Sequence, residues 1–151
     1  MNLKLLPLTA LVPAALILLS GCATGSNPGS PATAESLARW ENKDLKCVNL
    51  VVQGTPVSLP VDAGITLRIT GPGKVAGSSA VNRYFGGYTL GPAGAIHWTP
   101  FGSTRMAGPP ERMQLEDQFL KALESTTRAD VTPHGIVLQT SDASTRVEFS
   151  H

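Results

Sequence analysis

Charged residues are scarce in this sequence. They make up 15% of the 151 residues, against roughly 25% in an average soluble domain. The formal net charge is +1, so the chain has no basic excess with which to neutralise phosphates, and nucleic acid is excluded as a partner. A hydrophobic share of 42% with so balanced a charge also excludes a wholly disordered chain.

Signatures of catalysis and of metal binding are lacking as well. The segment Gly71-Pro72-Gly73-Lys74-Val75 lacks the spacing of a phosphate loop, and Val75 stands where such a loop has its magnesium-binding hydroxyl. No Gly-x-Ser-x-Gly nucleophile motif is present. The three histidines lie far apart and without a paired ligand motif. We therefore expect a protein that is not an enzyme, with no catalytic residues, no cofactor and no metal site.

Glycine and proline, in contrast, are abundant, with 15 and 12 residues. This share favours short strands joined by many turns over a helical bundle. Apolar and polar residues alternate in several short runs, which is typical of strands with one buried face. Because turn residues separate these runs closely, we expect antiparallel pairing. The apolar positions of the runs are Val48, Leu50 and Val52; Ile65, Leu67 and Ile69; Ile96 and Trp98; Ile136 and Leu138; and Val147 and Phe149.

One segment, from Pro110 to Arg128, has helical periodicity instead. Proline suits the first turn of a helix, and the apolar residues that follow recur at helical spacing. The segment therefore predicts one amphipathic helix lying against the sheet. Its apolar face comprises Leu115, Phe119, Ala122 and Leu123, and the pairs Asp117–Lys121 and Glu124–Arg128 have the spacing of ion pairs on the exposed face.

The first 21 residues have the features of a secretory signal. Lys4 gives the start a positive charge, and residues 5–19 form an uncharged, apolar run. As a helix this run would be about 22 Å long, shorter than the roughly 30 Å of the hydrocarbon core of a bilayer. Pro7 and Pro13 also disfavour a spanning helix. We predict a cleaved signal peptide over residues 1–21, with a short membrane anchor as the alternative.

The end of this signal, Leu19-Ser20-Gly21-Cys22, resembles a bacterial lipobox. The resemblance implies cleavage before Cys22 and acylation of its thiol, and three acyl chains would hold the protein on a membrane essentially permanently. Ala23 stands where lipoproteins of the inner membrane often have aspartate, which favours the outer membrane, with the domain facing the periplasm. Residues 22–34 are small and uncharged and predict a lipidated, flexible tether, followed by one domain over residues 35–151.

Three blocks in the centre of the chain carry a family resemblance. They are Asn82-Arg83-Tyr84-Phe85-Gly86-Gly87-Tyr88-Thr89-Leu90, Ser103-Thr104-Arg105-Met106-Ala107, and the helix with Glu116, Phe119 and Leu123. Together they resemble the META/HslJ family of small bacterial envelope domains, over about residues 40–149. The resemblance implies an α+β fold, mostly β: a compact antiparallel sheet or barrel-like domain with one amphipathic helix packed on it. It also implies a role in envelope maintenance or in tolerance of stress such as heat shock or antibiotics.

Two cysteines that many members of that family carry are missing. Their places hold Val81 and Gly108, so packing must supply the roughly 2–4 kcal/mol that a disulfide between them would contribute. The remaining thiol, that of Cys47, has the opposite parity to Val48 and Leu50. We therefore expect it to be partly exposed, and either inert in a half-buried strand or paired with another molecule.

The residues of the family blocks allow two interpretations. Asn82, Arg83 and Tyr84, with Tyr88 on the same strand face as Tyr84, are either determinants of the fold or a recognition edge. If Arg83 and Arg105 lie near Glu116, these three side chains form a partly buried ion-pair cluster.

For the function, we expect a lipid-anchored monomer that binds an envelope protein or another envelope component through a rigid β-surface. A first alternative is an inhibitor of a hydrolase such as a lysozyme or protease. Its inhibitory segment would be the loop from Phe101 to Pro110, which is rich in glycine and proline and contains Arg105. A second alternative is a carrier of a small apolar ligand in a barrel-like cavity.

Overall fold

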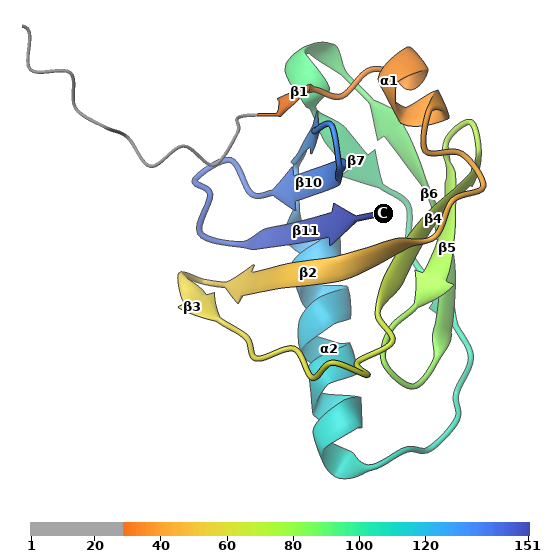
Figure 1. The fold of residues 1–151 in the computed structure, drawn as a ribbon, viewed down its shortest axis with the longest axis vertical. Helices are drawn as coiled ribbons and strands as arrows, with labels where there is room; N and C mark the ends of the chain where they lie inside the picture. Colours follow the sequence, from red (N-terminus) through yellow and green to blue (C-terminus); the bar gives the residue numbers. More distant parts are fainter. Residues whose placement is uncertain (1–28) are drawn as a thin grey trace, which may run out of the picture.

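The computed structural model describes residues 29–151, and their strands form one curved antiparallel sheet (Figure 1). The order across the sheet is β1-β9-β10-β11-β2-β4-β5-β6-β7, with β3 paired to β2 and β8 to β6. The predicted signal peptide, residues 1–21, and Cys22 lie outside the described residues. The elements are β1 (Ser30–Pro31), α1 (Ala34–Ala38), β2 (Leu45–Val52), β3 (Thr55–Pro56), β4 (Thr66–Gly71), β5 (Lys74–Ser78), β6 (Arg83–Leu90), the 3₁₀ turn η1 (Pro92–Gly94), β7 (Ile96–Trp98), β8 (Gly102–Ser103), α2 (Pro110–Ser125), β9 (Arg128–Val131), β10 (Gly135–Gln139) and β11 (Arg146–Ser150).

The last strand of this order, β7, returns to the beginning of β9, so the sheet curls almost into a barrel. The backbone N–H of Ile96 in β7 donates to the carbonyl of Thr127 at 2.9 Å, and Ala95 forms a bridge with Arg128 of β9. Because β7 returns to β9, the strand β4 lies on the wall opposite β9. The mostly β, barrel-like α+β fold with one amphipathic helix packed on it is therefore confirmed.

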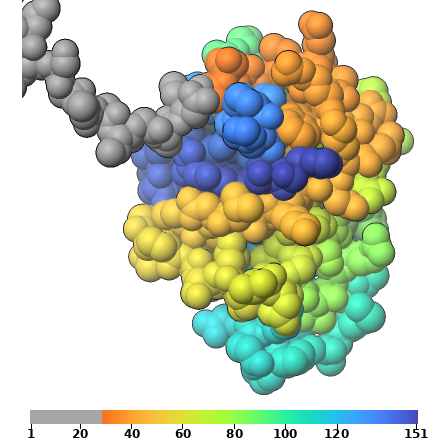
Figure 2. All heavy atoms as spheres, viewed as in Figure 1, coloured from red at the N-terminus to blue at the C-terminus, as the bar shows by residue number. Residues whose placement is uncertain are grey.

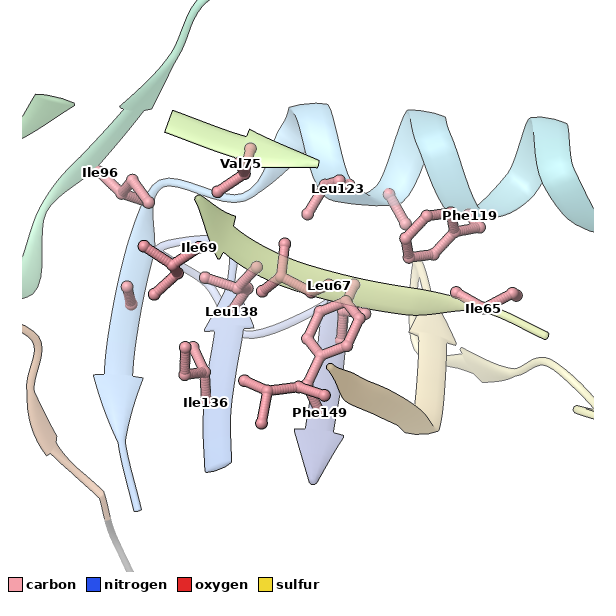
Figure 3. Packing of buried hydrophobic residues seen from close by; sticks show 14 of the residues in the cluster. Ile65, Leu67, Ile69, Val75, Ile96, Phe119, Leu123, Ile136, Leu138 and Phe149 are labelled. Atoms are coloured by element: carbon pink, nitrogen blue, oxygen red, sulfur yellow. The ribbon is translucent and has the colours of Figure 1, made fainter. Parts of the chain in front are cut away.

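The helix α2 lies behind β2 and β11 in Figure 1 and packs through its apolar face. Phe119 and Leu123 are fully buried and point into the cluster formed by β4, β10 and β11 (Figure 3). Phe119 meets the ring of Phe149 edge to face, at a centroid distance of 6.2 Å. The predicted helical stripe is thus the part of α2 that closes the core.

The predicted C-terminal end of this helix was wrong. The helix ends at Ser125, where the Thr126 hydroxyl donates to the carbonyl of Leu123 at 2.8 Å and the backbone becomes extended. Arg128 lies in β9 and binds Asp130 at 3.0 Å, so it does not form the predicted pair with Glu124. The other predicted pair, Asp117–Lys121, is present at 3.3 Å.

The strand β2 contains a bulge that changes its predicted faces. Asn49 pairs with Glu148 and Cys47 with Phe149, which leaves Val48 without a partner between them. The extra residue turns Val48 outward, where it is 57% exposed, although the alternation predicted it to be buried. Cys47 is half-buried, but on the side of the core rather than on the opposite side.

The predicted tether over residues 22–34 was too long. Ser30 pairs with Val131 of β9, and the backbone N–H of Ala32 donates to the carbonyl of Ala129 at 2.9 Å. Thr33 then caps α1: its hydroxyl accepts from the N–H of Ser36, whose own hydroxyl accepts from the N–H of Thr33. Backbone pairing and capping need no large apolar side chain. The composition of residues 30–34 therefore did not indicate that these residues are ordered.

The interior of the curled sheet is filled by side chains. The alternating positions predicted for the buried face of β4 are at most 4% exposed, and those of β10 and β11 at most 3% (Figure 3). The space left between the sheet and Leu37 is about 10 Å³, no more than one water molecule requires. The described part of the chain therefore does not support the carrier of an apolar ligand.

Candidate functional site

Asn82 and Glu116 form the centre of a buried polar cluster, which we call the Asn82–Glu116 clamp. Asn82 directly precedes β6, and Glu116 lies on the buried side of α2; they are 2% and 6% exposed. The side-chain amide of Asn82 donates to Oε1 of Glu116 at 2.8 Å, and its backbone N–H donates to Oε2 at 2.7 Å. The clamp thus joins the start of a central strand to the helix.

Two further donors complete the shell of the Glu116 carboxylate. The hydroxyl of Ser79 and the backbone N–H of Val81 donate to Oε2 at 2.9 and 3.2 Å. Burial raises the pKa of Glu116, but the hydrogen bonds from Asn82, Ser79 and Val81 outweigh it and hold the pKa below its ordinary value. The carboxylate is therefore ionised near neutral pH and is unsuited to moving a proton there.

The carbonyl end of the Asn82 side chain holds the loop that precedes α2. Its Oδ1 accepts from the Thr104 hydroxyl and from the backbone N–H of Met106, both at 2.8 Å. Its amide nitrogen also donates to the carbonyl of Met106 at 3.2 Å. The three blocks that carry the family resemblance therefore meet at one asparagine, which supports its interpretation as a determinant of the fold.

The predicted ion-pair cluster of Arg83 and Arg105 with Glu116 was wrong. Both arginines are exposed, and the donors around Glu116 are neutral amide and hydroxyl groups. Neutral donors satisfy the carboxylate without the cost of desolvating a guanidinium group. Arg83 and Arg105 are consequently free to act on the surface.

Tyr84 and Tyr88 belong to the core. Tyr84 is 1% exposed, its hydroxyl donates to the carbonyl of Thr66 at 2.8 Å, and burial raises its pKa. Its ring meets those of Phe101 and Phe119, and Tyr88 packs against Trp98. These tyrosines position strand β6 and offer no recognition edge to a partner.

Gly86 allows the ring of Phe101 to approach the backbone of β6 closely. A Cβ atom at this position would lie 2.5 Å from the ring of Phe101, closer than van der Waals contact allows. The ring of Phe101 therefore packs directly on the backbone of β6 and links this strand to the start of the loop that the clamp holds.

One surface feature was missed by sequence reasoning. The strands β2, β4, β5 and β6 contain no acidic residue, and each has one exposed or half-buried cation: Lys46, Arg68, Lys74 and Arg83. We call the outer face of these four strands the basic face. Each cation alternates with buried residues, but only the register across four strands brings them onto one surface.

A curled antiparallel sheet covered by one long helix, which a buried Asn–Glu pair fixes in place, defines a small α+β half-barrel domain. The model of the META domain family matches residues 37–151, and the chain belongs to this family. The predicted resemblance is therefore confirmed. None of the curated proteins matches the chain.

Two solved structures share the fold. The NMR structure of a protein from Burkholderia xenovorans is 22% identical, with a TM-score of 0.63, and the match covers 96% of this chain and 97% of that chain. A second NMR structure is 19% identical, with a TM-score of 0.55, over 79% of this chain and 94% of that chain. At these identities the likeness concerns the fold alone.

Two further observations concern residues 29–151 only. No helix among them is long and apolar enough to cross a membrane. No three of their His, Cys, Asp and Glu side chains are grouped closely enough to hold a metal ion.

Proposed function

We propose that this META-domain protein is a lipid-anchored, non-enzymatic binding module of the bacterial outer membrane, facing the periplasm. It would act in envelope maintenance or stress tolerance. The observation that carries the proposal is the lipobox-like sequence ending at Cys22, which precedes the first strand, β1, by only seven residues, 23–29.

The short connection supports a domain held next to its membrane. Seven residues span at most about 25 Å when fully extended, so an acylated Cys22 would keep β1 within that distance of the lipid. In Figures 1 and 2, β1 and the loop from Phe101 to Pro110 lie at opposite ends of the molecule. An anchored domain would therefore present this loop to the periplasm.

The state of the buried acidic groups supports binding rather than catalysis. Glu116 is saturated by the clamp, and Asp130 accepts hydrogen bonds from Arg128 and Gln139. A general acid or base needs a free, correctly placed proton site, and these two groups are committed to the fold.

Acylation is tested by metabolic labelling with a palmitate analogue in cells that express the full chain. We expect a label on the wild type and on Cys47→Ser, which keeps the lipobox cysteine, and none on Cys22→Ser. We also expect Cys22→Ser to leave the outer-membrane fraction. An unlabelled wild type, or a Cys22→Ser variant that fractionates like the wild type, would contradict the anchoring.

Binding is tested separately by a photo-crosslinking residue at Arg105 or Arg83, in intact cells. We expect a discrete crosslinked product at these exposed positions and none at Lys121, which is exposed on α2. The same product from a folded, unrelated outer-membrane lipoprotein would contradict a specific binding role.

The loop from Phe101 to Pro110 favours hydrolase inhibition as a second candidate. Asn82 fixes this loop at Thr104 and Met106, while Arg105 between them is exposed and Met106 is 56% exposed. A loop fixed in one conformation loses little entropy on binding. Inhibition assays against lysozymes and periplasmic proteases, with Arg105→Ala as the variant and Lys121→Ala as the control, test this function.

A further inference from the structure

The basic face gathers four cations on adjacent strands of the described molecule. Residues 29–151 contain equal numbers of basic and acidic side chains, because Lys4 is the one charged residue before them. Four of those cations nevertheless lie on four adjacent strands that contain no acid. The nearest carboxylate, that of Asp44 just before β2, is neutralised by Arg68, which donates to both of its oxygens. Lys46, Lys74 and Arg83 remain without an anionic partner in the described structure.

The basic face contains a shallow hollow of about 440 Å³, within the usual size range of small-ligand sites. The hollow exists because β5 contributes the small residues Ala76 and Gly77, which leave space between the longer side chains of the neighbouring strands. One row across the strands consists of Lys46, Thr66, Ser78 and Arg83, so two cations flank two hydroxyl residues. Arg68 lies in the next row, opposite Ala76.

The chemistry of this hollow selects among anionic ligands. Each of its strands is paired on both sides, so the hollow offers no free strand edge for the backbone of a peptide. It offers cations, hydroxyl groups, the carboxylate of Asp44, which Arg68 already pairs, and one aromatic ring. That ring is Phe85, which pairs with Ala76 and is 60% exposed beside the hollow. Cations bind acid groups, hydroxyls bind the hydroxyls of a sugar, and an exposed ring packs on the apolar face of a sugar ring.

We propose that this hollow binds an acidic sugar chain. Lys46 and Arg83 bind its acid groups, Ser78 binds its hydroxyls, and Phe85 packs against a sugar ring. The proposal rests on the binding role stated above, for which it names the ligand class, but it does not depend on acylation of Cys22.

The position of the hollow agrees with a ligand outside the anchoring membrane. Its central strand, β4, lies on the wall opposite β9, and β9 is the strand that pairs with β1. The described chain begins at β1, and β4 and β1 lie on different sides of the curled sheet (Figure 1), so the strand that carries the hollow lies away from the point where an anchor would attach. The headgroups of the anchoring leaflet are therefore a poor occupant.

The test is calorimetric titration with oligogalacturonate, a carboxylated sugar chain. The protein in the calorimeter cell comprises residues 22–151 and carries Cys22→Ser. This chain keeps every described element. We expect saturable binding that weakens with salt, and no binding of a neutral dextran oligomer of equal length. Lys46→Gln/Arg83→Gln should weaken binding about tenfold, because it removes two ion pairs at the surface. Arg39→Gln/Lys43→Gln, which removes two exposed cations elsewhere, should weaken it less than about twofold.

Three outcomes overturn the proposal. Oligogalacturonate does not bind, or the two double variants lose the same affinity, or poly-L-glutamate of equal charge binds as tightly. The last outcome would assign the basic face to an acidic polypeptide instead. All four substituted residues are exposed, so unchanged thermal unfolding of each variant shows that the fold is retained. Because the tested chain has no lipid, a negative result leaves the anchoring at Cys22 unaffected, and the labelling experiment decides that point separately.

Discussion

A Cβ atom placed on Gly108 would lie 3.5 Å from the Cβ of Val81. This separation is at the short end of the range for a disulfide, about 3.5–4.5 Å. The two methyl groups of Val81 lie 2.8 and 2.9 Å from the same position, so the valine fills the space where sulfur atoms would lie. The two positions for which the family resemblance implied a cysteine pair are thus in contact in this chain, and the side chain of Val81 packs between them.

We expect Val81→Cys/Gly108→Cys to form a disulfide on air oxidation. The bond would close a loop of 27 residues along the chain and raise the free energy of unfolding by about 2–4 kcal/mol. The measurement is urea unfolding with and without reductant, in a background with Cys22→Ser and Cys47→Ser. Each single cysteine variant is the control and should show no reductant effect. An oxidised double variant no more stable than its reduced form would contradict the geometry.

We expect Asn82→Asp to destabilise the protein by about 3 kcal/mol at neutral pH. The substitution keeps the shape of the side chain but places a second carboxylate about 3 Å from Oε1 of Glu116 and removes two donated hydrogen bonds. Because one of two adjacent carboxyl groups takes up a proton as the pH falls, the deficit relative to the wild type should shrink toward pH 4. Urea unfolding of the variant and the wild type at neutral pH and at pH 4 measures this difference in stability.

Asn49 provides a matched control for that variant. Its side-chain amide donates to Oε1 of Glu148 at 3.3 Å, but this pair is only partly buried. Solvent screens the repulsion there, so Asn49→Asp should cost less than about 1 kcal/mol. Equal losses in the two variants would show that burial of the clamp does not set its energy.

The wild-type protein should lose stability in acid through Glu116. The folded-state pKa of this carboxyl lies below its ordinary value of 4.5, so the folded protein binds the proton less readily than the unfolded chain. Its contribution is therefore complete above about pH 5 and is lost as the pH falls through the folded-state pKa. Unfolding curves between pH 7 and 3 should be less pH-dependent in Glu116→Gln than in the wild type. Parallel curves would contradict the ionised clamp.

Cys47 should behave as an inert thiol. Burial raises its pKa to about 12, so the reactive thiolate is rare at pH 8. We expect iodoacetamide to label Cys47 slowly in the folded chain carrying Cys22→Ser, and rapidly in urea. A disulfide-linked dimer on non-reducing gels would favour the intermolecular pairing that the sequence left open.

Alternation and helical spacing predicted the elements whose side chains carry the fold. The apolar faces of β4, β7, β10 and β11 and the buried stripe of α2 lie where the sequence placed them, because burial of one face is a local pattern. The order around β1 was not predictable in this way, since Ser30 and Ala32 are held by backbone hydrogen bonds to a strand 100 residues away along the chain.

The sequence singled out two residues of the clamp but not the arrangement of the clamp. The sequence identified Asn82 and Glu116, but it paired the glutamate with arginines, because an opposite charge is the expected partner of a carboxylate. The sequence alone does not show which backbone and side-chain amides the fold brings to the Glu116 carboxylate. The bulge at Val48 changed the faces of β2 without any proline or glycine to mark it. The basic face depends on registers between four strands, which a single strand does not encode.

The first and last strands of the described chain meet beside one turn. Ser30 pairs with Val131, and the backbone N–H of His151 donates to the carbonyl of His134 at 3.0 Å, so both lie next to the turn between β9 and β10. A circular permutant is therefore feasible, in which a short glycine-rich linker joins residue 151 to residue 29 and new termini open after Ala107. Such a chain should keep the half-barrel. Because it would no longer be confined to an N-terminal attachment, it would allow the domain to be displayed with its basic face toward any chosen surface.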